Sequence, residues 1–146
     1  NGDTAQANAL DDYEEGTFTP GMTIGGLNTT ATHAYGTYVK VGRLVTCFGR
    51  LTLSSNGSGT GGAVFTGLPF TVADLVSTTS LEGGGFFTYQ DNVSGVYGAM
   101  TILPSQLSTQ ASIYYAQSAN GNMTGASESN IANNFDSRFV FSYQTA

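Results

Sequence analysis

Residues 35–55 read YGTYVKVGRLVTCFGRLTLSS, and this stretch decides the fold class. It is rich in β-branched and aromatic side chains, which suit a pleated sheet, and Gly42 divides it into two runs. Hydrophobic side chains alternate along the second run, which is the pattern of a strand with one buried face. On one face lie Val45, Cys47, Leu51 and Leu53, and on the other lie Leu44, Thr46, Phe48, Arg50 and Thr52. Gly49 interrupts the first face and indicates a bulge or a close approach of the backbone.

Shorter runs of the same kind follow, separated by loops of Gly, Ser, Asn and Thr. They lie at 63–70, 85–90, 95–103, 111–117 and 137–144. In the last run, Phe139, Phe141 and Tyr143 share one face. A helix of one or two turns is the most that 72–76 or 127–133 would allow. The pattern predicts about eight strands in an all-β, antiparallel, jelly-roll-like β-sandwich. We expect residues 1–16 to be a leading segment or linker and 17–146 to form a single domain.

Composition excludes several classes of protein. The 146 residues contain 10 acidic and 4 basic side chains, so the net charge is −6 and no basic surface for nucleic acid or anionic membrane is expected. A single Cys excludes an intrachain disulfide, and one Cys with one His excludes a four-ligand Cys/His zinc site within the chain. The sequence shows no signal peptide and no apolar run long enough to span a membrane. We therefore expect a soluble domain with no cofactor and no membrane insertion.

Catalytic motifs are absent. His33 is the single imidazole, in a loop-like stretch, and Cys47 lies among apolar neighbours, where a buried thiol is the common situation. A glycoside hydrolase would need two carboxylates that meet, and the candidates are scattered: Asp74, Glu82, Asp91, Glu128 and Asp136.

Tyrosine rings in or beside strands suit either packing or stacking on a sugar: Tyr89, Tyr97, Tyr114 and Tyr115.

Four of the ten acidic residues fall within the sequence DDYEE, which comprises Asp11, Asp12, Tyr13, Glu14 and Glu15. Clustered carboxylates can bind a hard cation such as Ca²⁺, although the spacing differs from that of an EF-hand loop. The alternative is a structural turn or an inter-subunit contact. The sequence favours the structural use and assigns no metal ligand.

The stretch LDDYEEGTFTP, from Leu10 to Pro20, resembles the opening of a domain found near the C-terminus of tail-fibre and tail-spike proteins of tailed bacteriophages. Residues 36–45 are similar to the G-x-Y-x-K-x-G-x-x-V strand pair of that family, and GLPF at 67–70 is in the expected position. FDSRFVFSYQTA at 135–146 is similar to its closing strand, whereas residues 71–122 match no motif. Phe18 stands where the family commonly has Trp.

The resemblance implies a distal receptor-binding head domain, cut from a longer fibre and assembled as a homotrimer in the extracellular virion. Its partners would be the rest of the tail fibre and a host surface glycan or outer-membrane protein, with no enzymatic activity. For receptor contact we expect the loops 54–62, 91–94 and 119–125, with Tyr89, Asn92, Tyr97, Tyr114, Asn120 and Asn122. For the trimer interface or structural packing we expect the DDYEE residues with Phe139, Phe141 and Tyr143. The alternatives are a structural trimerisation domain that caps the fibre end and, less favoured, a polysaccharide depolymerase.

Overall fold

The computed structural model describes residues 12–74, 83–119 and 121–145. Within these ranges the chain forms strands and turns with no helix. The strands are β1 (Tyr13–Phe18), β2 (Gly21–Ile24), β3 (Leu27–Asn28), β4 (Thr30–Val41), β5 (Leu44–Ser55), β6 (Ala63–Thr66), β7 (Gly83–Val93), β8 (Tyr97–Pro104), β9 (Gln110–Ala116), β10 (Met123–Gly125) and β11 (Ile131–Gln144). The antiparallel all-β class expected from the sequence is confirmed.

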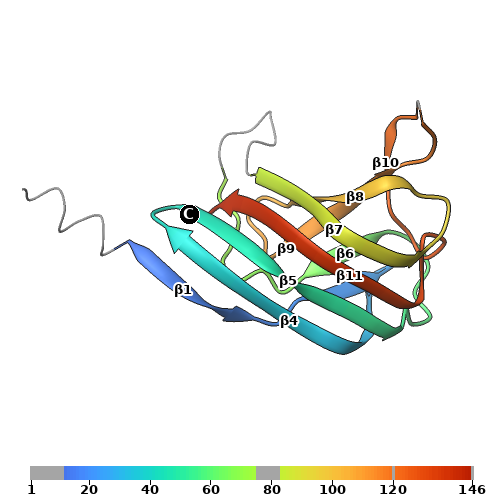
Figure 1. Cartoon of the computed structure of the whole chain (residues 1–146), viewed down its shortest axis with the longest axis horizontal. Helices are drawn as coiled ribbons and strands as arrows, with labels where there is room; N and C mark the ends of the chain where they lie inside the picture. The colour runs from blue at the N-terminus through green and yellow to red at the C-terminus, as the bar shows by residue number, and fades with distance from the viewer. Residues whose placement is uncertain (1–11, 75–82, 120, 146) are drawn as a thin grey trace, which may run out of the picture.

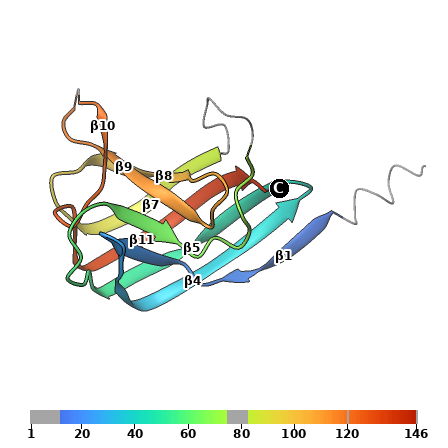
Figure 2. The ribbon, with the colours of Figure 1, turned by 180° about the vertical axis from the view of Figure 1, so that it is seen from behind.

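All strands belong to one antiparallel sheet in the order β1-β4-β5-β11-β7-β8-β9-β6-β2-β3, with β10 paired to β9. The sheet folds over between β7 and β8, so β1, β4, β5, β11 and β7 form a first layer and β8, β9, β6 and β2 form a second (Figures 1 and 2). Contacts between the layers show the closure directly. The ring of Phe65 on β6 lies 5.0 Å from that of Phe139 and 5.6 Å from that of Phe141, both on β11.

The core fills the space between the layers. β11 alternates buried Phe139, Phe141 and Tyr143 with outward-facing residues, as the period of two predicts. The predicted inner face of β5 is buried as well, with Val45, Cys47, Leu51 and Leu53 at most 1% exposed. At Gly49 the backbone does approach closely, because an added Cβ would lie 2.5 Å from the Phe139 ring and 2.4 Å from the Tyr35 carbonyl oxygen.

The described strands are more numerous than the eight expected. β2, β3 and β10 are only two to four residues long, too short for an alternation to be visible in sequence. The helical turns considered at 72–76 and 127–133 are not present in the described part of those stretches. Residues 128–130 form a turn and β11 begins at Ile131, while Val72 forms an isolated bridge with Thr145.

β1 carries most of the LDDYEEGTFTP stretch into the sheet, so the boundary expected after residue 16 falls inside a strand. It pairs with β4 through two reciprocal aromatic–glycine contacts. Gly16 faces Tyr38, whose ring lies where a Cβ on Gly16 would be, and Phe18 in turn covers Gly36. A side chain at either glycine would displace the ring above it. Gly16 and Gly36 are thus explained by packing, whereas Gly42 lies in the turn between β4 and β5 with a positive φ of 58°.

Replacing Phe65 with alanine tests the closure of the two layers. Phe65→Ala removes the ring that contacts both Phe139 and Phe141, so we expect the free energy of unfolding to fall by about 3–5 kcal/mol. Denaturant unfolding followed by circular dichroism measures the change. Leu27→Ala, at an exposed β3 position, is the control and should change it by less than about 0.5 kcal/mol. Equal effects of the two variants would contradict the assigned core.

Candidate functional site

Polar loops gather at the end of the molecule opposite to the start of β1 (Figure 1). The Asn56 backbone N–H donates to the Asn133 side-chain oxygen at 2.9 Å, and the Asn56 amide donates to the Ile131 carbonyl oxygen at 2.9 Å. Gly61 N–H donates to a Glu128 carboxylate oxygen at 2.7 Å. These bonds tie the loop 54–62 to the start of β11 and to the turn that precedes it.

The turn between β7 and β8 joins the same network. Asn130 donates from its side-chain amide to the Ser94 carbonyl oxygen at 3.0 Å, and Ser94 N–H donates back to the Asn130 carbonyl oxygen. Asn92 has a left-handed backbone with φ of 58°, and its amide donates to the Asn134 carbonyl oxygen at 2.8 Å. Asparagine tolerates this conformation better than most residues. The end of the domain is therefore a rigid polar surface.

A shallow hollow of about 450 Å³ lies elsewhere, between β1 and β4, and a second of about 280 Å³ lies on the outer face of the second layer. The second is lined by Thr101, Leu103, Tyr114 and Met123. Tyr97 lies in a neighbouring row, because Tyr97 and Met123 both pair with Ala116 of β9. Tyr97 and Met123 are exposed, whereas the ring of Tyr114 is half-buried. The arrangement offers aromatic and thioether surface beside the polar loops, which suits the apolar face of a sugar or an apolar side chain.

The structure brings together only part of the residue set expected to contact a receptor. Tyr97, Tyr114 and exposed Asn122 lie on or beside the hollow, whereas Asn92 lies near the end of β7, bonded to Asn134 of β11. Tyr89 lies apart from them on the outer face of the first layer, beneath the Arg138 guanidinium at 4.6 Å from the ring centre. Asn120 lies outside the described residues.

The aromatic face of the last strand is buried inside the chain. Phe139, Phe141 and Tyr143 were expected at a trimer interface or in structural packing, and they are at most 3% exposed within one chain. The Tyr143 hydroxyl also donates to the Phe70 carbonyl oxygen at 3.0 Å and accepts from the Phe70 N–H. Their role is packing inside the chain, because the fold-over of the sheet covers them before any partner can.

The acidic cluster is part of a strand edge. Tyr13 donates to Glu15 and Tyr38 donates to Glu14, each at 2.7 Å, and these bonds raise the pKa of both phenols. The Asp12 carbonyl oxygen accepts from Gly42 N–H, while Asp11 lies outside the described residues. No group of three or more potential metal ligands forms within the described ranges. These contacts give the cluster a structural use at β1.

The candidate catalytic side chains are kept apart or engaged. His33 lies in β4 rather than in a loop, and it pairs with Thr52 of β5. Cys47 is five residues from Thr52 along β5, so His33 and Cys47 are separated by roughly 16 Å along the strand direction. Asp136 forms a bidentate ion pair with Arg50 at 3.0 Å and accepts from Thr52. Glu128 and Asp91 accept backbone N–H bonds, Asp74 is exposed, and Glu82 lies outside the described residues.

Sequence reasoning missed the segment 126–134, which organises the loop end through Glu128, Asn130, Asn133 and Asn134. A dense run of Ser and Asn, ASESNIANN, was the available signal. It was not distinguishable from other loops because its partners are distant in sequence.

No described helix is long and apolar enough to cross a membrane.

Comparison with known proteins identifies a similar fold. No family model and no curated protein sequence matches the chain. Among solved structures, the crystal structure of the Dettilon tailspike protein (gp208) matches with a TM-score of 0.67 and 15% sequence identity. The match covers 90% of this chain and 24% of the tailspike chain, so this chain spans about a quarter of that protein. At this identity the similarity establishes the fold.

The thiol of Cys47 provides a test of the β4–β5 core. Burial raises the pKa of this thiol to about 12, so almost no thiolate exists at pH 8. We expect the Cys47 thiol of the folded protein to react only slowly with a thiol reagent such as dithionitrobenzoate at pH 8. In denaturant, one thiol per chain should react rapidly. Rapid reaction of the folded protein, with its circular dichroism unchanged, would contradict the burial.

The ion pair of Asp136 predicts a pH-dependent stability. Hydrogen bonds from Arg50, and then from Thr52, outweigh partial burial and hold the pKa of this carboxyl below its ordinary 3.8. Its stabilisation is therefore complete well above pH 3.8 and is lost as the pH falls through the lower folded value. Asp136→Asn should cost about 1 kcal/mol at pH 7 and progressively less as the pH falls below 3.8. Unfolding curves at several pH values measure this, with Asp74→Asn as the exposed control; a pH-independent difference would contradict it.

Proposed function

We propose that this domain is the non-enzymatic, receptor-binding head of a phage tail fibre or tailspike. It would belong to the family that the LDDYEEGTFTP stretch resembles and would act as a homotrimer on the extracellular virion. The likeness of the fold to a tailspike protein supports a tail-related role. The receptor would be a bacterial surface glycan or outer-membrane protein.

One observation carries the proposal. The hydrogen-bonded polar loops lie toward the end of the domain away from the start of β1 (Figures 1 and 2), and the hollow lined by Tyr114 and Met123 lies on the outer face of β8, β9 and β10. If the chain joins the fibre through β1, this end points away from the particle. The amides there offer hydrogen bonds to hydroxyl groups, and the rings offer stacking surface.

The described residues support binding better than hydrolysis. Asp136 is neutralised by Arg50, and Cys47 is buried with a raised pKa. The remaining described carboxylates outside the DDYEE cluster are Asp91 and Glu128, which accept backbone bonds, and Asp74, which is exposed. A carboxylate pair acting on a glycosidic bond would need one acid with a raised pKa, whereas the hydrogen bonds from Arg50 hold the pKa of Asp136 below its ordinary value.

The test is binding of the fluorescently labelled domain to a panel of intact bacterial hosts. Tyr97→Ala and Tyr114→Ala should each weaken binding about tenfold, since a lost stacking contact is worth about 1 kcal/mol or slightly more. Leu107→Ala is the control, because Leu107 is exposed near the opposite end, where its N–H bonds the Val72 carbonyl oxygen. Removing surface glycan by enzyme separates a sugar receptor from a protein receptor.

Three outcomes would contradict the proposal. A stable oligomer that binds no host cell would favour the trimerisation and assembly role. Release of reducing ends from host polysaccharide would favour a depolymerase. If Leu107→Ala weakens binding as much as Tyr97→Ala and Tyr114→Ala do, the receptor site lies elsewhere on the domain.

A further inference from the structure

The outer face of the first layer carries an unusual amount of exposed hydrophobic surface. Among the described residues, eleven large hydrophobic side chains are exposed, and alternation places seven of them on this one face of β1, β4, β5, β11 and β7. They are Tyr13, Tyr35, Val41, Leu44, Phe48, Phe86 and Tyr89. We call this surface the outer face of the first layer.

The residues form continuous rows across the strands. Val140 of β11 pairs with Phe48 on one side and with Phe86 on the other, and the two rings are 47% and 48% exposed. Thr37 and then Thr17 extend this row to β1. A second row runs from Tyr35 through Arg50 and Arg138 to Tyr89. Single exposed hydrophobic residues are ordinary, whereas the unbroken apolar row of Phe48, Val140 and Phe86 is of the kind found at interaction sites.

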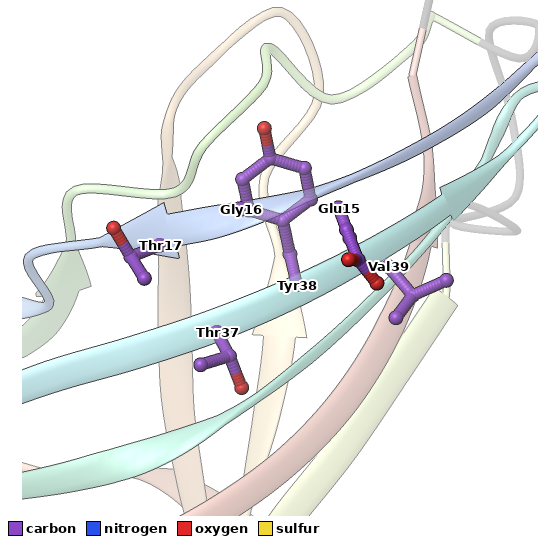
Figure 3. A pocket seen from close by; sticks show the side chains of 6 residues that line it. All are labelled: Glu15, Gly16, Thr17, Thr37, Tyr38 and Val39. Atoms are coloured by element: carbon purple, nitrogen blue, oxygen red, sulfur yellow. The ribbon is translucent and has the colours of Figure 1, made fainter.

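The face also contains a hollow, on the opposite side from Phe86. The depression of about 450 Å³ is lined by Glu15 and Thr17 of β1 and by Thr37 and Val39 of β4, with Tyr38 reaching across β1 beside Gly16 (Figure 3). By strand alternation, Glu15, Thr17, Thr37 and Val39 lie on the same side of the sheet as Phe48. The face therefore carries the exposed rings of Phe48 and Phe86 on its β5 to β7 side and a hollow on its β1 to β4 side.

Charge divides the face in the same way. Arg138 has no carboxylate within ion-pair distance among the described residues, whereas Arg50 is paired with Asp136. Glu15 lies on the β1 side, at the edge of the hollow. A partner that covers this face needs an anion opposite Arg138, a cation opposite Glu15 and a recess for the two phenylalanines. A second copy of this chain, placed with its β1 side against the β7 side of the first, supplies all three.

We propose that the outer face of the first layer is the surface through which copies of this chain associate, head to tail, with the β7 side of one copy against the β1 side of the next. Because the two halves differ, the contact is heterologous, and such contacts form a ring of copies when the rotation between neighbours closes and an open filament when it does not. Five strands span about 24 Å, and Leu44 to Arg50 span about 23 Å, so the whole face measures on the order of 550 Å². Each copy shares this face between two neighbours, so each contact covers about half of it. The proposal extends the proposed function by naming the assembly surface, and it does not depend on the receptor site.

The first experiment measures the mass of the chain in solution by light scattering over about 1–100 µM. Phe48→Glu places a charge in the centre of the band and should give a folded monomer. Leu27→Glu is the matched control, because Leu27 is equally exposed but lies on β3, in the other layer. Circular dichroism and thermal melting establish that each variant is folded.

A charge exchange tests the head-to-tail geometry. Arg138→Glu alone should raise the dissociation constant of the assembly about tenfold or more through repulsion of Glu15 on the next copy. Glu15→Arg combined with Arg138→Glu should restore most of the lost affinity, because the ion pair is re-formed in reverse. Arg138→Glu with no effect, or a double variant no better than Arg138→Glu alone, would overturn the head-to-tail arrangement.

The remaining outcomes separate this inference from the proposed function. If the unaltered chain is a monomer, the proposed interface is wrong. It is also wrong if Phe48→Glu assembles to the same mass as the unaltered chain. If Phe48→Glu keeps its mass but loses binding to host cells, the face contacts the host, and the receptor-binding role survives while the interface does not. If the chain assembles through this face and binds no host, the interface stands and the receptor-binding role fails.

Discussion

The packing of β11 against β6 is the contact on which the rest of the structure depends. β11 is the only described strand that hydrogen-bonds to both β5 and β7, and its inner face carries the rings that meet Phe65 from the opposite layer. Without that contact the folded-over sheet would expose an aromatic face on each side. The loop end depends on it as well, because the turn that holds Asn56 and Ser94 is the segment that leads into β11.

The fold class was predictable because alternation is a local property. The buried positions of β5 and β11 follow from the spacing of Val45, Cys47, Phe139 and Phe141 in the sequence, and the structure buries all of them. What the alternation does not reveal is the identity of the partner that covers a hydrophobic face. Phe139, Phe141 and Tyr143 were therefore assigned to an interface or to packing with equal reason, and only the fold-over between β7 and β8 distinguishes the two.

The candidate site was less predictable, since its residues come together through long-range contacts. Tyr97 and Tyr114 were found from their ring type and their position beside polar loops, and the structure places them near each other. Tyr89 has the same signal in sequence and lies in the other layer, stacked with Arg138. The organising residues of the loop end, Glu128 and Asn130, have partners 67 and 36 positions away, which no local pattern would indicate.

The position of the last strand has a consequence for biosynthesis. β11 is the last described strand in chain order, yet it lies in the middle of the first layer, between β5 and β7. During translation β5 and β7 therefore leave the ribosome before the strand that joins them, and their inner faces stay uncovered until β11 follows. Such a delay exposes strand edges and hydrophobic surface on the nascent chain, which is the state that chaperones protect from aggregation.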